Sequence, residues 1–413
     1  MLERTFTLYK NAFQGLSKEI WLFTIVMFIN RVGAMVLPFV TIYMTENLGF
    51  TLSQTGWVMA SYGLGSSAGT YVGGRMTDRY GAWLTQVFSL VMAGLGFFCL
   101  IFIHSFIGFC IAYFFVIFFA DILRPASMAA VGTYSKPENQ TRAMSLIRLA
   151  INLGYGAGAG LGGLIAFYIG YHGLFLVDGI TCLLAAAFVI FMIPRKDIEQ
   201  QEAAKKQENI NNQSPYRDGN FLIFIAFLFF TAFMFLQLLC TIPVYLKSEF
   251  LLNEAQLGLV NMGNCFIIAL FEMPIIYELE NRKQSKLKMC ALGVGMIVLS
   301  FWVFLIPGQS VLIIIAFVLL ITFGELISFP FTSSFVLDQS NAINRGAYMA
   351  LYSLVWSIAW IISPKVGFEI ADIFGWDVLW LGIGFCGTVA VIGYLLLEKR
   401  MKNKALALAV AER

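Results

Sequence analysis

Three carboxylic acids interrupt long apolar runs of this sequence and are candidates for proton binding: Asp121, Glu272 and Glu325. An ionisable group inside a membrane span costs about 2.5–3.5 kcal/mol on insertion scales, so each one is a functional hypothesis. Glu325 has no basic neighbour within one helical turn, and loss of water favours the protonated form of an isolated carboxyl. Two structural alternatives stay open. Glu325 could donate a hydrogen bond to another helix, and Glu272 could pair with basic loop residues.

Basic, amide and aromatic side chains in the same runs predict where a solute binds. The candidates are Arg31, Arg124, Arg148, Asn152, Tyr352 and Trp356. Arg124 follows Asp121 by three residues, so the two share one helical face, and Pro125 frees a backbone carbonyl beside them. A self-neutralising pair that only holds helices together is the alternative. Tyr352 and Trp356 belong to an aromatic stripe with four-residue spacing, which suits either helix packing or the wall of a solute cavity.

The distribution of these charges favours a particular class of solute. The arginines fall in the N-terminal half of the chain, and Glu272 and Glu325 fall in the C-terminal half. A cavity with one positive and one negative wall suits a zwitterion or an organic anion. Asp178 and Lys365 lie closer to the ends of their runs, where we expect them to snorkel or to pair near the interface.

The composition places the chain in a bilayer. Of its 413 residues 59% are hydrophobic and 12% charged, whereas soluble domains have about 25% charged residues. The net charge of +3, without a basic cluster carrying interleaved aromatics, argues against nucleic-acid binding. The seven cysteines lie in apolar runs without metal-ligand spacing, so neither disulfides nor a metal site is predicted. No phosphate-binding loop and no nucleophile with a base is recognisable, so neither an enzyme nor a cofactor is expected.

Spans of about 20 apolar residues predict the fold class, an all-α membrane protein with about twelve transmembrane helices. They form two six-helix bundles, in residues 1–195 and 221–413, joined by a polar cytoplasmic linker in residues 196–220. A constant offset places Tyr43 on Tyr245 and Gln54 on Gln256, as expected for two parallel repeats.

Lysine and arginine gather in alternate loops and at both ends of the chain, and the other loops contain only Lys247. By the positive-inside rule both termini and the basic loops are cytoplasmic. We therefore expect a multi-pass protein of the cytoplasmic (inner) membrane, and we expect a monomer.

A small charged turn joins the second and third predicted spans. It contains Gly74, Asp78, Arg79 and Gly81. These residues match Gly-x-Leu-x-Asp-Arg-x-Gly, the loop signature of the major facilitator superfamily, although Trp83 follows where that motif has basic residues. The resemblance covers essentially the whole chain and implies a conformational gate at this turn.

A glycine run on the fifth predicted span is similar to the superfamily's antiporter motif. Gly154, Gly158 and Gly162 form a ridge without side chains, along which another helix can pack closely. This similarity implies a multidrug/proton antiporter that exports amphipathic compounds. Packing alone is the other interpretation of the ridge.

Three further segments resemble proton-coupled oligopeptide transporters: Leu123-Arg124-Pro125, Ile151-Asn152-Leu153-Gly154, and Gly324-Glu325-Leu326 with Pro330. This second resemblance implies proton-driven symport of a peptide-like solute. We therefore expect a proton-coupled secondary active transporter that moves a small zwitterionic or anionic solute by alternating access, with the drug antiporter as the alternative. Sodium coupling, and a receptor built on the transporter fold, stay open.

Overall fold

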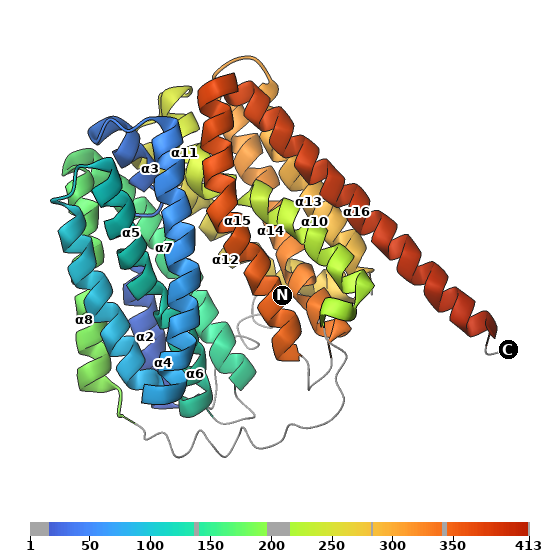
Figure 1. The fold of residues 1–413 in the computed structure, drawn as a ribbon, viewed down its shortest axis with the longest axis horizontal. Coiled ribbons are helices and arrows are strands. Elements are labelled where there is room, and N and C mark those ends of the chain that lie inside the picture. Colours follow the sequence, from blue (N-terminus) through green and yellow to red (C-terminus); the bar gives the residue numbers. More distant parts are fainter. Residues whose placement is uncertain (1–15, 136–139, 196–214, 282–283, 341–344, 412–413) are drawn as a thin grey trace, which may run out of the picture. The chain divides into compact units, whose positions relative to one another are not determined.

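The computed structural model describes residues 16–135, 140–195, 215–281, 284–340 and 345–411, and their regular elements are all helices (Figure 1). Residues 196–214 of the expected linker lie outside this described part. The helices before the linker are α2 (Lys18–Val32), α3 (Val40–Ile42), the π-helix η1 (Tyr43–Asn47), α4 (Leu52–Leu100), α5 (Phe106–Asp121), α6 (Leu123–Tyr134), α7 (Gln140–Tyr168) and α8 (Tyr171–Met192).

The helices after the linker follow in the same manner. They are the 3-10 turn η3 (Pro215–Arg217), α10 (Gly219–Phe235), α11 (Gln237–Ser248), α12 (Glu254–Asn281), α13 (Lys286–Trp302), the 3-10 turn η4 (Val303–Leu305), α14 (Val311–Gln339), α15 (Arg345–Phe374) and α16 (Trp376–Ala411). Ten helical stretches of the described residues are long and apolar enough to cross a membrane.

The ten stretches and the first span together match the predicted number of about twelve spans. The stretch α4 counts as two spans, because Gly81 breaks it with a φ of 83°, a conformation that glycine adopts without steric cost. The first predicted span corresponds to α2 followed by an irregular segment and then α3 and η1, and it is too short in each piece to count among the ten. The predicted all-α fold with about twelve membrane helices is therefore confirmed.

The chain separates into two compact units. Unit 1 contains Met1–Leu48, Ser61–Gln207 and Asn253–Cys265, and unit 2 contains Gly49–Ala60, Glu208–Leu252 and Phe266–Arg413. Thus the first turns of α4 cluster with unit 2, and the first turns of α12 cluster with unit 1. Within unit 1, α2 packs against α7 and α8; within unit 2, α13 packs against α14 and α16.

The expected sequence repeat has a counterpart in how α4 and α12 begin. The backbone N–H of Thr51 donates to Gln54 Oε1 (3.0 Å), and the N–H of Gln54 donates to Thr51 Oγ1 (3.1 Å). Asn253 and Gln256 form the same reciprocal pair, with both distances 2.9 Å. Each pair is a capping box that satisfies two backbone donors at a helix N-terminus. The two halves of the sequence therefore start the corresponding helices by the same local chemistry.

Candidate functional site

The first membrane crossing is interrupted beside its arginine. Helix α2 ends at Val32, and helical structure resumes only at Val40. The interruption leaves backbone N–H groups without helical acceptors. In a membrane such groups need other hydrogen-bond acceptors within the protein. The carboxylate of Asp178 on α8 accepts from the N–H of Met35 (2.9 Å) and from the N–H of Val36 (3.1 Å).

Asp178 therefore does not snorkel; it pairs with backbone N–H groups of the first membrane crossing. Its side chain is only 2% exposed, and it holds the interrupted segment of α2 against α8. The sequence position within its span suggested an outer location, but the interruption of α2, which supplies the two donors, is not evident from α8 itself. A carboxylate in an apolar run was the available signal.

Arg31 occupies the last turn of α2, directly before the interruption. Its Nε is buried and makes no hydrogen bond within the described residues. Its guanidinium lies within electrostatic reach of Asp121, Arg124 and Tyr62, all in unit 1. The structure thus brings together two residues predicted to bind solute, Arg31 and Arg124, and one predicted to bind protons, Asp121.

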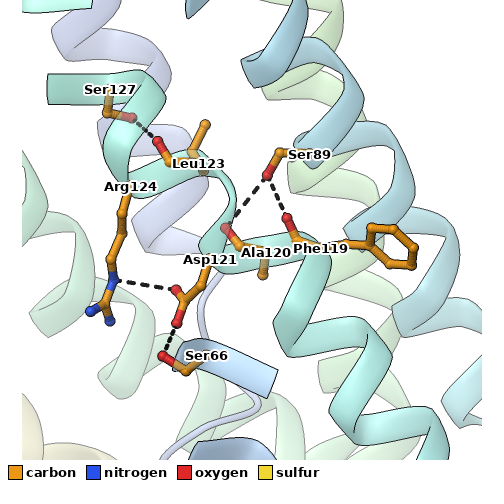
Figure 2. Close-up of polar contacts among 8 residues, drawn as sticks. All are labelled: Ser66, Ser89, Phe119, Ala120, Asp121, Leu123, Arg124 and Ser127. Atoms are coloured by element: carbon orange, nitrogen blue, oxygen red, sulfur yellow. Dashed lines mark hydrogen bonds and ion pairs between the residues drawn. The ribbon is translucent and has the colours of Figure 1, made fainter. Parts of the chain in front are cut away.

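Asp121 lies between Arg124 and Ser66 in this cluster (Figure 2). Arg124 Nε lies 3.3 Å from Asp121 Oδ1, and Ser66 Oγ on α4 donates a hydrogen bond to Asp121 Oδ2. The Asp121 side chain is 11% exposed, whereas that of Arg124 is 53% exposed. The guanidinium of Arg124 is therefore accessible to a ligand, whereas both oxygens of the Asp121 carboxylate already have partners.

The cluster lies where α5 meets α6. Pro125 cannot donate to the carbonyl four residues earlier, and α5 ends at Asp121 before α6 begins at Leu123. Ser89 Oγ on α4 donates to the carbonyl oxygen of Phe119 at 2.6 Å, which binds the end of α5 to α4 (Figure 2). Ile122 keeps helical dihedrals, so Asp121 and Arg124 lie on one helical face, as their three-residue spacing predicts.

The two guanidinium groups of the cluster differ in their direct contacts. Asp121 lies within hydrogen-bonding distance of Arg124, whereas Asp178, the second carboxylate of the same cavity, accepts from the backbone N–H groups of Met35 and Val36. A planar guanidinium presents several N–H donors and binds carboxylates or phosphates in bidentate fashion. The arrangement can therefore bind an anionic group through donors that Asp121 does not use.

A small cavity of about 90 Å³, lined by both polar and apolar side chains, lies inside unit 1 beside this cluster. Its lining includes Asn30, Arg31, Tyr62, Asp121, Asp178 and Cys182. A water molecule occupies about 30 Å³ in the liquid, so the space suits a few waters rather than an organic solute. The cavity links the surroundings of Arg31 to those of Asp178.

Two predicted solute contacts, Arg148 and Asn152, lie on α7 of the same unit. Arg148 is exposed and Asn152 is half-buried. The structure thus places both on one helix in the same unit as the cluster of Arg31, Asp121 and Arg124.

The predicted ridge of Gly154, Gly158 and Gly162 on α7 faces α2. A Cβ at Gly154 would lie 2.9 Å from Arg31 Cβ, and one at Gly162 would lie 3.0 Å from Met35 Cβ. Such distances leave no space for a side chain at either glycine. The close packing of α7 therefore positions both Arg31 and the interrupted segment of α2.

A second glycine face of α7, not recognised in the sequence, packs against the first turns of α12. A Cβ at Gly160 would lie 3.5 Å from Met262 Cβ, and one at Gly163 would lie 3.0 Å from the Cα of Gly258. The same dense glycine run contains both faces, so four-residue spacing identified only one of them. Helix α7 consequently approaches two neighbours closely.

In unit 2, α15 contains the two predicted aromatic solute contacts, Tyr352 and Trp356. Trp356 packs edge-on against Phe235 and Phe329, with ring centroids 6.1 Å and 5.3 Å away. Its indole Nε1 is buried and makes no hydrogen bond within the described residues. The hydroxyl of Tyr352 lies 3.4 Å from Thr332 Oγ1 on α14. Trp356 can thus offer a donor to a ligand.

The predicted proton sites of unit 2 lie on different helices. Glu325 on α14 and Glu272 on α12 are both half-buried. Glu325 follows Gly324, whose missing side chain allows α14 to approach α13 closely: a Cβ there would lie 2.7 Å from the carbonyl oxygen of Gly293. Its position along α14 is therefore fixed by backbone packing.

Lys365 on α15 is paired with neighbouring side chains, one of the two outcomes expected for it. Its Nζ binds Ser53 Oγ (3.1 Å) and Glu369 Oε2 (2.9 Å), and it lies 4.8 Å from the centre of the Trp57 ring. A Cβ at Gly56 would lie 3.0 Å from the Cα of Lys365. The first turns of α4 are therefore fastened to α15 within unit 2.

The charged turn after the second span is helical except at one residue. Asp78 and Arg79 are exposed within α4, and Gly81 provides the break. A Cβ at Gly74 would meet no atom within 4 Å, so packing does not require glycine there. Trp83 Nε1 donates to the carbonyl oxygen of Ile193 at 3.0 Å, which ties α4 to the end of α8 where the family motif has basic residues.

Comparison with known proteins agrees with this architecture. The profile of the Major Facilitator Superfamily matches residues 21–364. An uncharacterized MFS-type transporter of Bacillus subtilis (strain 168), YttB, is 24% identical, covering 91% of this chain and 94% of the relative. A Na(+), Li(+), K(+)/H(+) antiporter of Planococcus maritimus is 23% identical, covering 86% of this chain and 90% of that protein.

Solved structures share the fold at lower identity. The nucleoside transporter NupG superposes with a TM-score of 0.75 at 14% identity, covering 93% of this chain and 100% of that one. The peptide transporter POT in complex with sulfate gives 0.76 at 16% identity, covering 95% and 96%. These matches are membrane transporters, which agrees with the expectation that the protein is not an enzyme. The twelve-span helical architecture and the family profile together show that this chain is a multi-pass membrane transporter of the Major Facilitator Superfamily.

Proposed function

We propose that this transporter is a proton-coupled secondary carrier of a small organic solute that contains an anionic group, such as a zwitterion. The observation that supports it is the cluster in unit 1, in which Asp121 pairs with Arg124 and the buried Nε of Arg31 has no hydrogen-bond partner among the described residues. A cationic drug would meet two like charges at this cluster, whereas a carboxylate or phosphate would compensate them. We place the basic loops and both termini on the cytoplasmic side of the cytoplasmic membrane, by the positive-inside rule.

The solute contacts in this proposal have separate tasks. Arg31 and Arg124 bind the anionic group, Arg31 through an Nε that no atom of the described residues uses. In unit 2, Trp356 and Tyr352 are separate candidate solute contacts that offer an aromatic surface and an indole N–H. Arg148 and Asn152 on α7 are further candidate solute contacts.

Protons supply the drive in this proposal, and Glu325 is the first site to test. Glu325 is half-buried on a helix whose position is fixed by close contact with α13. Glu272 and Asp121 are further candidates. Asp78, Arg79 and the break at Gly81 would act as a conformational gate during alternating access. The peptide transporter with a similar fold and the antiporter named for H(+) exchange make proton coupling the first hypothesis.

A second candidate function is proton antiport of a cationic solute. The aromatic surroundings of Trp356 favour it, because aromatic faces attract organic cations. The relative named as an exchanger of Na(+), Li(+) or K(+) for H(+) also makes an inorganic cation worth testing.

Proteoliposomes that report internal pH distinguish these functions. Dialanine, uridine, ethidium and sodium chloride are added outside in turn. Acidification with dialanine is expected from symport of a zwitterion, whereas alkalinisation with ethidium or sodium would indicate antiport and contradict the proposal. Uridine tests an uncharged solute related to that of NupG.

The proton site can be tested separately with Glu325→Gln. This substitution removes the exchangeable proton and keeps the shape of the side chain, so we expect loss of proton-driven accumulation with preserved solute exchange. Asp372→Asn, an exposed position on α15 of the same unit, is the matched control. Unchanged accumulation in Glu325→Gln would remove Glu325 from the mechanism.

A further inference from the structure

We propose that Asp178 is a proton-binding site in the N-terminal helices, and that its protonation releases the interrupted segment of α2 next to Arg31. The segment comprises residues 33–39, between the end of α2 and the start of α3. The proposal adds a titrating group that neither the family profile nor the named relatives identify. Its consequence for transport rests on the proposed proton coupling, whereas proton binding itself does not.

The position of Asp178 gives its charge a direct mechanical effect. Both carboxylate oxygens are used, one by the N–H of Met35 and the other by the N–H of Val36. An ionised carboxylate accepts both bonds, but a proton added to one oxygen turns that oxygen into a hydroxyl donor facing an N–H donor. Protonation therefore removes one of the two attachments of the segment to α8 and forms only the new O–H bond.

Several titratable groups surround this site. Arg31 on α2, Tyr62 on α4, Tyr113 and Asp121 on α5, and Cys182 on α8 line the same cavity as Asp178. The Cys182 thiol is within electrostatic reach of both Asp178 and Arg31, so the carboxylate and the guanidinium lie in the same neighbourhood. The surroundings of Asp178 thus contain one guanidinium, one further carboxyl, two phenols and one thiol.

The cavity provides a route for the proton. Its volume of about 90 Å³ suits a few water molecules, and the polar groups of its lining extend from Asp178 to Arg31 and Asp121. Because Arg31 lies only four positions before Met35, a change at Asp178 reaches the predicted solute contact through a short stretch of backbone. Proton and solute would thus be coupled within unit 1.

Infrared difference spectroscopy of the full chain in liposomes tests proton binding directly. Spectra recorded between acidic and alkaline pH are expected to contain a carboxylic-acid C=O band that titrates and is missing in Asp178→Asn. Asp178→Glu should retain a shifted band, and the exposed control Asp372→Asn should retain the original one. Identical difference spectra for the wild type and Asp178→Asn would overturn the proposal.

A nitroxide at Leu37→Cys, with the seven native cysteines replaced, tests release of the segment. Below the midpoint the ratio of immobile to mobile label is expected to fall about tenfold per pH unit, as for one proton. In Asp178→Asn the label should be mobile at every pH, and a second label at the exposed Leu64 should not respond. If the mobility of the Leu37 label changed neither with pH nor with Asp178→Asn, the proposed release of the segment would be overturned.

Both measurements are made without solute, which separates this inference from the proposed function. If the wild type moved no proton with any solute, the proposed function would fail while the infrared band and the label still decided the role of Asp178. Proton-coupled transport with a pH-independent Leu37 label would contradict only the inference.

Discussion

At the scale of single residues, the local charge around Asp121 is what favours an anionic solute. Arg124 and Ser66 occupy both carboxylate oxygens, so the donors of Arg31 are left for another group. A guanidinium buried in a membrane protein is costly unless its N–H groups are hydrogen-bonded by the protein, a ligand or water. The Nε of Arg31, unused within the described residues, therefore supports a role in binding.

We expect Arg31→Gln to weaken binding of a carboxylate-bearing solute by about tenfold or more, since a hydrogen bond to a charged group contributes about 1.5–3 kcal/mol. Dissociation constants measured by calorimetry on purified protein would show it. Arg400→Gln, an exposed position on α16, is the control. Equal affinity in the wild type and Arg31→Gln would place the anionic group elsewhere.

Trp356→Phe tests the candidate solute contact in unit 2. The substitution keeps an aromatic ring between Phe235 and Phe329 and removes the buried N–H that has no partner in the described residues. Thermal stability should be unchanged or higher, because an unsatisfied buried donor is lost, while solute affinity falls about fivefold to tenfold. Unchanged affinity with raised stability would show that Trp356 only packs.

At the scale of helices, the two glycine faces of α7 determine how closely α2 and α12 approach. A Cβ at Gly158 would lie 2.5 Å from the backbone oxygen of Val32, which cannot move aside as a flexible side chain could. We expect Gly158→Ala to destabilise the protein by about 1–3 kcal/mol through overpacking. The apparent Tm in detergent measures the effect.

Gly382→Ala on α16 is the matched control for that substitution. No atom lies within 4 Å of its added Cβ, so only the higher helix propensity of alanine acts, and Tm should stay the same or rise. A similar decrease of Tm in both variants would mean that close packing against α2 is not the cause.

At the scale of the whole molecule, alternating access requires that some helix contacts open in each cycle. The contact between α7 and the first turns of α12 is a candidate, because the rest of α12 clusters with unit 2. The 3.5 Å between the Cβ positions at Gly160 and Met262 suits a disulfide.

We expect oxidation of a Gly160→Cys, Met262→Cys double variant to stop transport, and reduction with dithiothreitol to restore it. Native cysteines are replaced, Cys265 in particular, because it faces Gly156 one turn away. Each single-cysteine variant should transport under oxidising conditions. Full transport by the crosslinked protein would show that this contact stays closed throughout the cycle.

The general architecture could be predicted from the sequence because each long apolar run must form a helix in a bilayer. The pairing of Asp121 with Arg124 was also predictable, since both lie on one helical face with Pro125 beside them. The tasks of Asp178 and Lys365 were not, because each depends on a distant partner: the broken end of α2 for one and the start of α4 for the other. Spacing within a helix carries no information about such partners.

The glycine content of α7 also has a consequence for how the protein is made. Together with α12 and α15, α7 is the least apolar of the candidate spans, because glycines replace the larger apolar side chains that favour partition into lipid. During synthesis it leaves the ribosome after α2, whose backbone fits between its glycines. We infer that α7 enters the bilayer as a partner of a helix already there, so a substitution that spoils this fit would reduce the yield of inserted protein as well as its stability.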